Sequence, residues 1–245
     1  MLRRLLTPRR ILVHAGVALL VVIMVNLGMW QMRRLEEKKS FNSAVAARTS
    51  EPVGRADLVL AEGTDPSSVD WRRVAITGTY DAAEAVIVVN RSQDGAAGVD
   101  SLVPLRTTDG TVWLVNRGFV PLSMAVPAPQ SGQVTVVGYL RRTQTRGALG
   151  AIDSSDTDTK EFQRFDVERI AEQVDGDVAP MWVQRIEEVP SPDADWPAVV
   201  KLPALDEGPH LSYAAQWFFF SLVAVVGWFV AMRRSLRADD DPTTA

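Results

Sequence analysis

The chain has no cysteine among its 245 residues and only two histidines, His14 and His210. The absence of cysteine excludes disulfides, thiolate metal sites and thiol redox chemistry. Because no histidine falls between residues 31 and 209, this central part holds neither a histidine-based catalytic triad nor a zinc site of the usual histidine and cysteine kind. It also shows no phosphate loop, dinucleotide fingerprint or convincing pair of catalytic acids. We therefore do not expect an enzyme.

The central part of the chain is acidic. Residues 31–209 carry 19 basic and 27 acidic side chains, an excess of eight negative charges. Proteins that bind nucleic acid do so through clustered lysine and arginine, and an acidic surface repels the phosphate backbone. The charge balance therefore predicts no nucleic-acid partner.

Two uncharged apolar runs lie near the ends of the chain, at residues 11–30 and 211–232. A bilayer core of ~30 Å is crossed by about 20 helical residues, a length that both runs reach. Trp30 and Tyr213 are aromatic residues of the kind enriched at membrane interfaces. We therefore predict two transmembrane helices in contact with lipid, rather than buried core helices. The charged residues 31–39 after the first run favour an uncleaved anchor over a signal peptide.

The charges that flank the second run indicate its orientation. Arg233, Arg234 and Arg237 follow it, whereas Lys201 alone lies near its other end. Basic flanks stay in the cytoplasm, and two spans place both termini on the same side. We predict a protein of the plasma membrane with the following parts: a cytoplasmic N-terminus at 1–10, transmembrane helices at 11–30 and 211–232, an extracytoplasmic domain at 31–209, and a cytoplasmic tail at 233–245 that is disordered after Arg237.

The extracytoplasmic domain is predicted to be mostly β, because short alternating or β-branched segments are separated by turn residues. The expected strands are residues 74–80, 85–90, 102–106, 112–116, 134–140 and 181–186. Asp109-Gly110 marks a hairpin, and Asp166 caps one short helix that ends near Gly176. Residues 31–48 are expected to extend the first transmembrane helix. The fold class is thus a membrane α + β protein, with two transmembrane helices flanking a barrel- or sandwich-like β domain with one short helix.

Polar residues of the two apolar runs gather at one level, near the outer interface, and polar groups in a span are costly unless they have a role. They are Asn26, Gln31, His210, Tyr213 and Gln216. His210 lies at a helix N-terminus, where the helix dipole favours the neutral imidazole, the form that ligates a metal. The alternative is that His210 caps the helix or contacts a lipid headgroup. For Asn26 and Gln216 we favour hydrogen bonds between the helices.

Arg117 follows the predicted hairpin, between Asn116 and Gly118. Gly118 fits a bulge or a close approach of two backbones. Asn116 and Arg117 together could hold a carboxylate such as a haem propionate. The structural alternative, which we favour, is that Arg117 pairs with a nearby acidic side chain at the end of its strand.

Several motifs, in the same order and with the same two-span layout, resemble the surfeit locus protein one family, which assists cytochrome c oxidase assembly. They are Leu27-Gly28-Met29-Trp30-Gln31 with Arg34 and Lys38, Arg73-Val74 with Gly78-Thr79-Tyr80, residues 115–121, Val137-Gly138-Tyr139-Leu140-Arg141, and His210-Leu211-Ser212-Tyr213-Ala214-Ala215-Gln216-Trp217-Phe218. The last motif is the most specific, because it matches the family's His-Leu-x-Tyr-Ala-x-x-Trp-Phe signature. Gly208-Pro209 departs from the family, which often has asparagines before this histidine.

The resemblance implies a non-enzymatic chaperone of the respiratory chain that handles haem a transiently. By this resemblance, His210 would be the axial ligand of the haem iron. Trp30, Tyr213, Trp217 and Phe218 would line or flank the haem plane, since aromatic faces suit a flat macrocycle. The implied partners are cytochrome c oxidase subunits, membrane lipid and the haem synthesis machinery.

Two other functions remain open at this point. The first is a membrane scaffold that binds oxidase subunits without carrying haem itself, with His210 as a helix cap. The second is a membrane hydrolase that works through carboxylates, which no pair of acids in the sequence supports. Residues 142–160 and 189–206 carry no recognisable motif.

Overall fold

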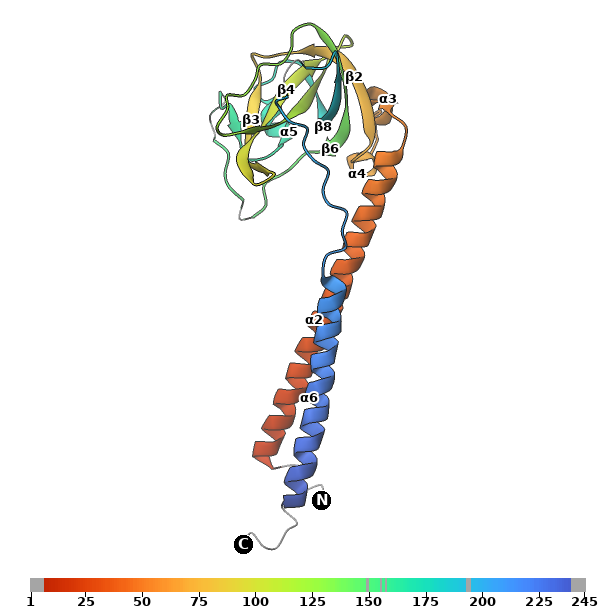
Figure 1. Cartoon of the computed structure of the whole chain (residues 1–245), viewed down its shortest axis with the longest axis vertical. Helices are drawn as coiled ribbons and strands as arrows, with labels where there is room; N and C mark the ends of the chain where they lie inside the picture. The colour runs from red at the N-terminus through yellow and green to blue at the C-terminus, as the bar shows by residue number, and fades with distance from the viewer. Residues whose placement is uncertain (1–6, 149, 155, 157, 193–194, 239–245) are drawn as a thin grey trace. The chain divides into compact units, whose positions relative to one another are not determined.

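The computed structural model describes residues 7–148, 150–154, 156, 158–192 and 195–238. It divides into two compact units, Met1–Ala44 with Ala204–Ala245, and Val45–Pro203. Figure 1 shows the helices of the first unit and the β-rich second unit. The expected start of the cytoplasmic N-terminus and most of the expected disordered tail lie outside the described residues.

The first unit is built on two long helices, α2 (Pro8–Ser50) and α6 (His210–Ala238). Both are long and apolar enough to cross a membrane. Only 11% and 6% of their most apolar stretches are buried in the protein, which contradicts the alternative of core helices. The α2 helix continues well past its apolar run, as predicted for residues 31–48. Pro52 and Gly54 follow its end, and neither residue favours continuation of a helix.

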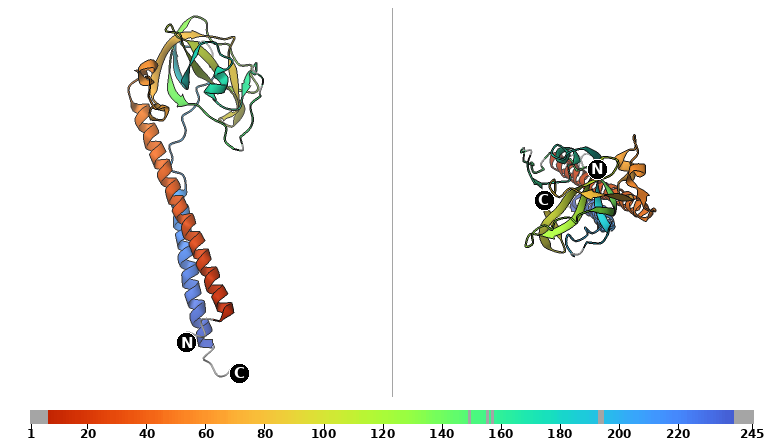
Figure 2. Two further views of the ribbon diagram at one scale, coloured as in Figure 1. Left: turned by 180° about the vertical axis from the view of Figure 1, so that it is seen from behind. Right: turned by 90° about the horizontal axis from the view of Figure 1, so that it is seen from above.

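The two helices pair antiparallel, side by side in both Figure 1 and Figure 2. Hydrogen bonds join Arg10 to Ser235 and Trp228 to His14 at one end, and Gln31 to His210 at the other. The least exposed residues recur at intervals of four, three and four, a spacing typical of coiled-coil seams. These residues are Met24, Gly28, Gln31 and Leu35 on α2, and His210, Ala214, Trp217 and Ser221 on α6.

Gly28 lets the two helices approach closely. A Cβ atom at this position would lie 2.7 Å from Cε1 of Phe218, so any larger residue would displace that ring. Ala214 and Ser221 are the buried small residues on the facing helix. This agrees with the small residues of helix pairs in membranes, where packing rather than hydrophobic burial drives association.

The second unit contains one eight-stranded sheet in the order β1-β2-β6-β8-β5-β4-β3-β7. An additional pairing of β2 with β4 makes the pairings β2-β6-β8-β5-β4 return to β2. The strands are β1 (Gly54–Arg55), β2 (Arg73–Tyr80), β3 (Val86–Gln93), β4 (Ala96–Arg106), β5 (Thr111–Pro121), β6 (Gln133–Arg142), β7 (Glu161–Phe162) and β8 (Asp177–Val189). All six predicted strands are present, and β4, β5 and β8 are longer than predicted.

Three short helices accompany the sheet: α3 (Ala56–Val59), α4 (Pro66–Val69) and α5 (Val167–Ala171). The sequence predicted only α5, and the Asp166 side chain caps it as expected by accepting a hydrogen bond from the Arg169 amide. The expectation of a single short helix is therefore wrong. The α3 and α4 helices have only four residues each, too few to show a helical periodicity in the sequence.

Arg117 and Gly118 form a bulge in β5. Ser101 of β4 faces Gly118 and Leu102 faces Asn116, so Arg117 is the additional residue. Gly118 has φ +134°, and a Cβ atom on it would lie 2.1 Å from the backbone oxygen of Ala198. Two hydrogen bonds join Phe119 and Ala198 beside this contact. The predicted bulge with a close backbone approach is thus confirmed.

We expect Gly118→Ala to lower the free energy of unfolding by more than about 3 kcal/mol, because it adds a backbone clash to an unfavourable φ. Gly95→Ala is the matched control, since Gly95 also has positive φ (+81°) but nothing within 4 Å of its added Cβ. It should cost about 1 kcal/mol. Thermal unfolding of the full chain in detergent measures both. Equal losses of stability would show that the contact with Ala198 is absent.

Candidate functional site

The loop before α6 places His210 at the first residue of the helix. Within the first unit, the backbone oxygen of Asp206 accepts a hydrogen bond from Asn42 of α2 (3.0 Å). The Asp206 side chain accepts another from the Gly208 amide (2.9 Å). The oxygen of Pro209 then accepts the Tyr213 amide, which closes the first turn of α6. The imidazole of His210 is consequently carried by a well-anchored helix start.

His210 is bonded to Gln31 on the facing helix. The distance from Nδ1 of His210 to Oε1 of Gln31 is 2.8 Å. An amide oxygen only accepts hydrogen bonds, so Nδ1 is the donor and carries the ring proton. In a neutral ring, which carries a single ring proton, Nε2 then keeps its lone pair. Within the described part of the chain no residue hydrogen-bonds to Nε2, and a neutral imidazole nitrogen of this kind is a metal ligand.

Glycine at position 208 leaves the Nε2 edge of the ring uncovered. A Cβ atom at Gly208 would lie 3.5 Å from Cδ2 and 3.6 Å from Nε2 of His210, in van der Waals contact with both. Gly208 also has φ +65°, a conformation that side chains other than glycine seldom adopt. Gly208, one of the two residues that depart from the family, thus leaves the Nε2 edge of the His210 ring accessible.

The predicted aromatic residues lie on the same pair of helices. Trp30 precedes Gln31 and is 47% exposed, while Tyr213 lies one turn after His210 and is 46% exposed. Trp217 is half-buried in the seam, with its ring edge-to-face with Phe220 at 6.4 Å. Four of the five predicted site residues therefore belong to one unit, and two of them present exposed aromatic surface.

The other polar residues of the helix pair have different partners. The side chain of Asn26 donates to the Val22 oxygen of its own helix (2.7 Å), so the prediction of a bond between the helices is wrong for Asn26. His14 accepts a hydrogen bond at Nδ1 from the Trp228 indole (2.9 Å), and the two rings meet edge-to-face. Because the histidines bond at opposite ends of the helix pair, they cannot ligate one metal within one chain.

Arg117 belongs to the second unit and is buried there, with 3% of its surface exposed. Its guanidinium donates to the Pro127 oxygen (2.9 Å) and lies over the ring of Tyr80 (5.6 Å). Burial lowers the pKa of Arg117 and raises that of Tyr80. The hydrogen-bond acceptor of Arg117 is thus a backbone carbonyl, where we expected an acidic side chain.

Sequence reasoning missed the polar groups that surround Arg117. The backbone oxygen of Arg117 accepts from Nε of Arg185 (2.7 Å), and Arg185 forms an ion pair with Glu188 (3.6 Å). Asn116 donates to Asp100 (3.2 Å) and accepts from the Gly118 amide (2.9 Å). Burial raises the pKa of Asp100. These polar residues stand in adjacent pairs, Asn116-Arg117 in β5 and Gln184-Arg185 in β8, so no alternating pattern in the sequence marked them as buried.

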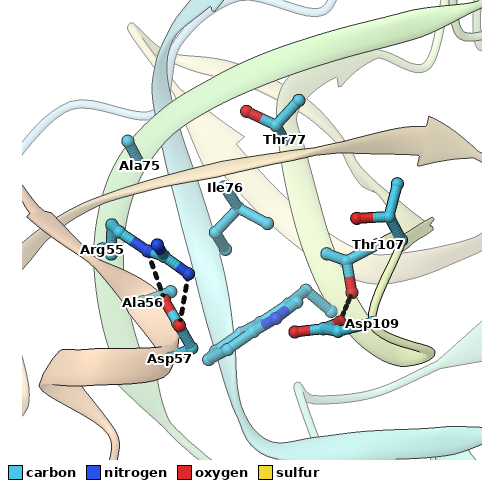
Figure 3. A pocket seen from close by; sticks show the side chains of 10 residues that line it. Arg55, Ala56, Asp57, Ala75, Ile76, Thr77, Thr107 and Asp109 are labelled. Carbon is cyan, nitrogen blue, oxygen red and sulfur yellow. Dashed lines mark hydrogen bonds and ion pairs between the residues drawn. The ribbon is translucent and has the colours of Figure 1, made fainter.

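A pocket of about 360 Å³ lies elsewhere on the sheet, between α3 and the β4–β5 turn (Figure 3). Its charged side chains already have hydrogen-bond partners within the pocket. Arg55 makes two hydrogen bonds to Asp57 (3.1 and 2.7 Å), and Thr107 bonds to Asp109. Among the described residues no group of three or more histidines or acids is placed to hold a metal ion. The lining of this pocket includes none of the predicted site residues.

A protein-family model described as the SURF1 family matches residues 18–222. The chain belongs to the SURF1 family. It is 25% identical over 234 residues to a SURF1-like protein of Monosiga brevicollis, covering 87% of this chain and 85% of the relative. It is 24% identical over 240 residues to Surfeit locus protein 1 of Takifugu rubripes, covering 86% and 93%. An uncharacterised SURF1-like protein of Mycobacterium tuberculosis is 25% identical over 206 residues, covering 82% and 74%.

We expect Arg117→Ala to reduce the free energy of unfolding by about 2–3 kcal/mol, because it leaves the buried Pro127 carbonyl without its donor and opens a cavity over Tyr80. Lys201→Ala is the control, since Lys201 pairs with Asp94 on the exposed surface and surface pairs contribute little. Thermal unfolding of the two variants checks this. An Arg117→Ala protein as stable as the control would contradict the structural role of Arg117.

Proposed function

We propose that this SURF1-family chain is an assembly factor for cytochrome c oxidase that assists delivery of haem a to the catalytic subunit. The observation that carries the proposal is the Nε2 of His210, which has no hydrogen-bond partner among the described residues, on a helix pair that also carries the exposed Trp30 and Tyr213. The implied partners are oxidase subunits and the machinery that makes haem. We assign no catalytic role to any residue.

The residues of the helix pair fit a haem. His210 offers one imidazole, the commonest axial nitrogen ligand, and the glycine at position 208 leaves its ligating edge open. Trp30 and Tyr213 supply exposed aromatic surface for a flat macrocycle. Haem a would supply the iron and its redox chemistry. The chain would hold the iron through one side chain, and a single protein ligand suits a carrier that must release its cargo.

A second candidate function is a membrane scaffold for oxidase subunits that carries no haem. The bond between Gln31 and His210 supports it, because this bond accounts for His210 as a link between the helices without any ligand. The two functions differ in what happens at Nε2, so they are separable by a haem-binding measurement.

We also propose that α2 and α6 cross the plasma membrane, with both termini in the cytoplasm and the central domain outside it. Their length and hydropathy support the crossing. The arginines after residue 232 support the orientation, because basic flanks are retained in the cytoplasm.

For haem binding, we expect the purified full chain, co-expressed with haem a synthesis, to show a Soret absorption band. His210→Ala should reduce haem occupancy at least tenfold, because it removes the axial ligand. His14→Ala is the matched control and should keep the band, since His14 bonds to Trp228 at the other end of the helix pair. Circular dichroism establishes that both variants fold. A full band in His210→Ala would refute the ligand assignment, and no band in any folded sample would favour the scaffold.

For topology, the cysteine-free sequence allows labelling without background. We expect Ser131→Cys, in an exposed loop of the central domain, to react with a membrane-impermeant maleimide in intact cells or spheroplasts. Thr7→Cys, before α2, should react only after the membrane is permeabilised. The opposite labelling pattern would reverse the orientation, and labelling of both in intact cells would exclude a double crossing.

A further inference from the structure

The bond between Gln31 and His210 does more than join two helices. We propose that Gln31 is a positioning residue, which fixes His210 in the tautomer with the proton on Nδ1 and the lone pair on Nε2. As a role in haem ligation, this rests on the function proposed above. As a statement about the imidazole, it holds for the chain without haem and is testable there.

With Oε1 of Gln31 turned towards the ring, a neutral imidazole has one assignment of its proton. Oε1 of Gln31 lies 2.8 Å from Nδ1 of His210, and a carbonyl oxygen has no proton to give. Nδ1 must therefore donate. A neutral imidazole carries one ring proton, so Nε2 is left as the nucleophilic nitrogen. Without Gln31, the choice between the two tautomers would be set by solvent and lipid.

Gln31 is held where it can impose this choice. It occupies the α2 seam between Gly28 and Leu35, and Leu35 is almost fully buried. On the facing helix, His210 is followed in the seam by the buried Ala214. Both side chains thus extend from rigid helical backbone, and the loop that leads into His210 is tied to Asn42 of the same α2 helix.

His14 provides an internal reference, because its ring proton is expected on the other nitrogen. Its Nδ1 accepts the N–H of Trp228, which has no other hydrogen-bonding group, so its own proton must lie on Nε2. The two histidines of this chain are therefore expected in opposite tautomers. No general effect of detergent, temperature or pH produces that difference, because such effects act on both rings alike.

A hydrogen-bond acceptor at Nδ1 makes the opposite nitrogen a stronger ligand. Partners of this type orient metal-ligating histidines, and their removal typically costs 10–100-fold in metal affinity. Gln31→Leu should accordingly weaken haem binding by about tenfold or more. Gln31→Glu keeps an acceptor oxygen and should retain binding. It should also lower the haem midpoint potential, whereas Gln31→Leu should raise it, because a more basic ligand favours ferric iron.

The deciding experiment is ¹⁵N NMR of the histidine rings in the haem-free full chain, in lipid nanodiscs at a pH of about 8, where imidazole is neutral. Two tautomers are expected in the wild type, with Nδ1–H for His210 and Nε2–H for His14. His14→Leu assigns the signals. Gln31→Leu should convert His210 to the Nε2–H form that free histidine prefers, without changing His14. Gln216→Leu is the matched control, since Gln216 is exposed on α6, and it should change neither ring.

The outcomes separate this inference from the proposed function. An Nε2–H tautomer for His210 in the wild type, or an unchanged tautomer in Gln31→Leu, would overturn the positioning role, whether or not haem binds. If the tautomers are as expected but the folded wild type takes up no haem, the haem proposal fails and Gln31 retains only its role in fixing the ring. If haem binds and Gln31→Leu binds it equally well with an unchanged potential, the positioning role in ligation is wrong.

Discussion

The antiparallel seam between α2 and α6 is the constraint on which the candidate site depends. In a membrane, helices gain little from hydrophobic burial against each other, so they associate through close packing and hydrogen bonds. The seam shows both. The ring of Phe218 lies so close to Gly28 that any side chain at this position would displace it. The buried residues Ala214 and Ser221 on the facing helix also have small side chains. Hydrogen bonds between the helices occur towards the ends of the pair, where Gln31 meets His210 and His14 meets Trp228. The position of His210 is thus a consequence of how the two helices fit.

Much of the fold could be predicted from local patterns in the sequence. The two apolar runs, the extension of α2, the Asp166 cap and the Asp109-Gly110 hairpin are each contained in a few neighbouring residues. What the sequence could not reveal is long-range. The parallel pairing of β5 with β8 joins residues 66 to 68 positions apart, and the contact of Gly118 with Ala198 joins residues 80 apart. The glycine at position 118 indicated a bulge or a close backbone approach, but no local pattern in the sequence identified the approaching segment.

The candidate site was predictable to the same extent. The sequence predicted the level along the helices at which five polar residues lie, but not the direction in which each points around the helix axis. These residues are Asn26, Gln31, His210, Tyr213 and Gln216. At about 100° of rotation per residue, Gln31 lies on the same seam as Gly28, whereas Asn26 points well away from it. Asn26 accordingly bonds to its own backbone. A heptad count along α2, starting from Gly28 and Leu35, would have singled out Gln31 as the partner. The burial of Arg117 depends on strands that pair far along the chain, and no such count could have found it.

The two ring nitrogens of His210 have separate roles. Nδ1 links the helices through Gln31, and Nε2 is left for a ligand. If the ligating nitrogen also joined the helices, binding a ligand would break the link, and releasing the ligand would require the ring to turn back. Here Nδ1 faces Gln31, and Nε2 lies on the ring edge that Gly208 leaves uncovered. The imidazole can therefore gain or lose a ligand without a change in rotamer or in the helix seam. This arrangement would suit the haem carrier proposed above, whose cargo is temporary. It also explains why a scaffold and a haem carrier would share the same helix geometry, because the link through Nδ1 is present in both and only the use of Nε2 differs.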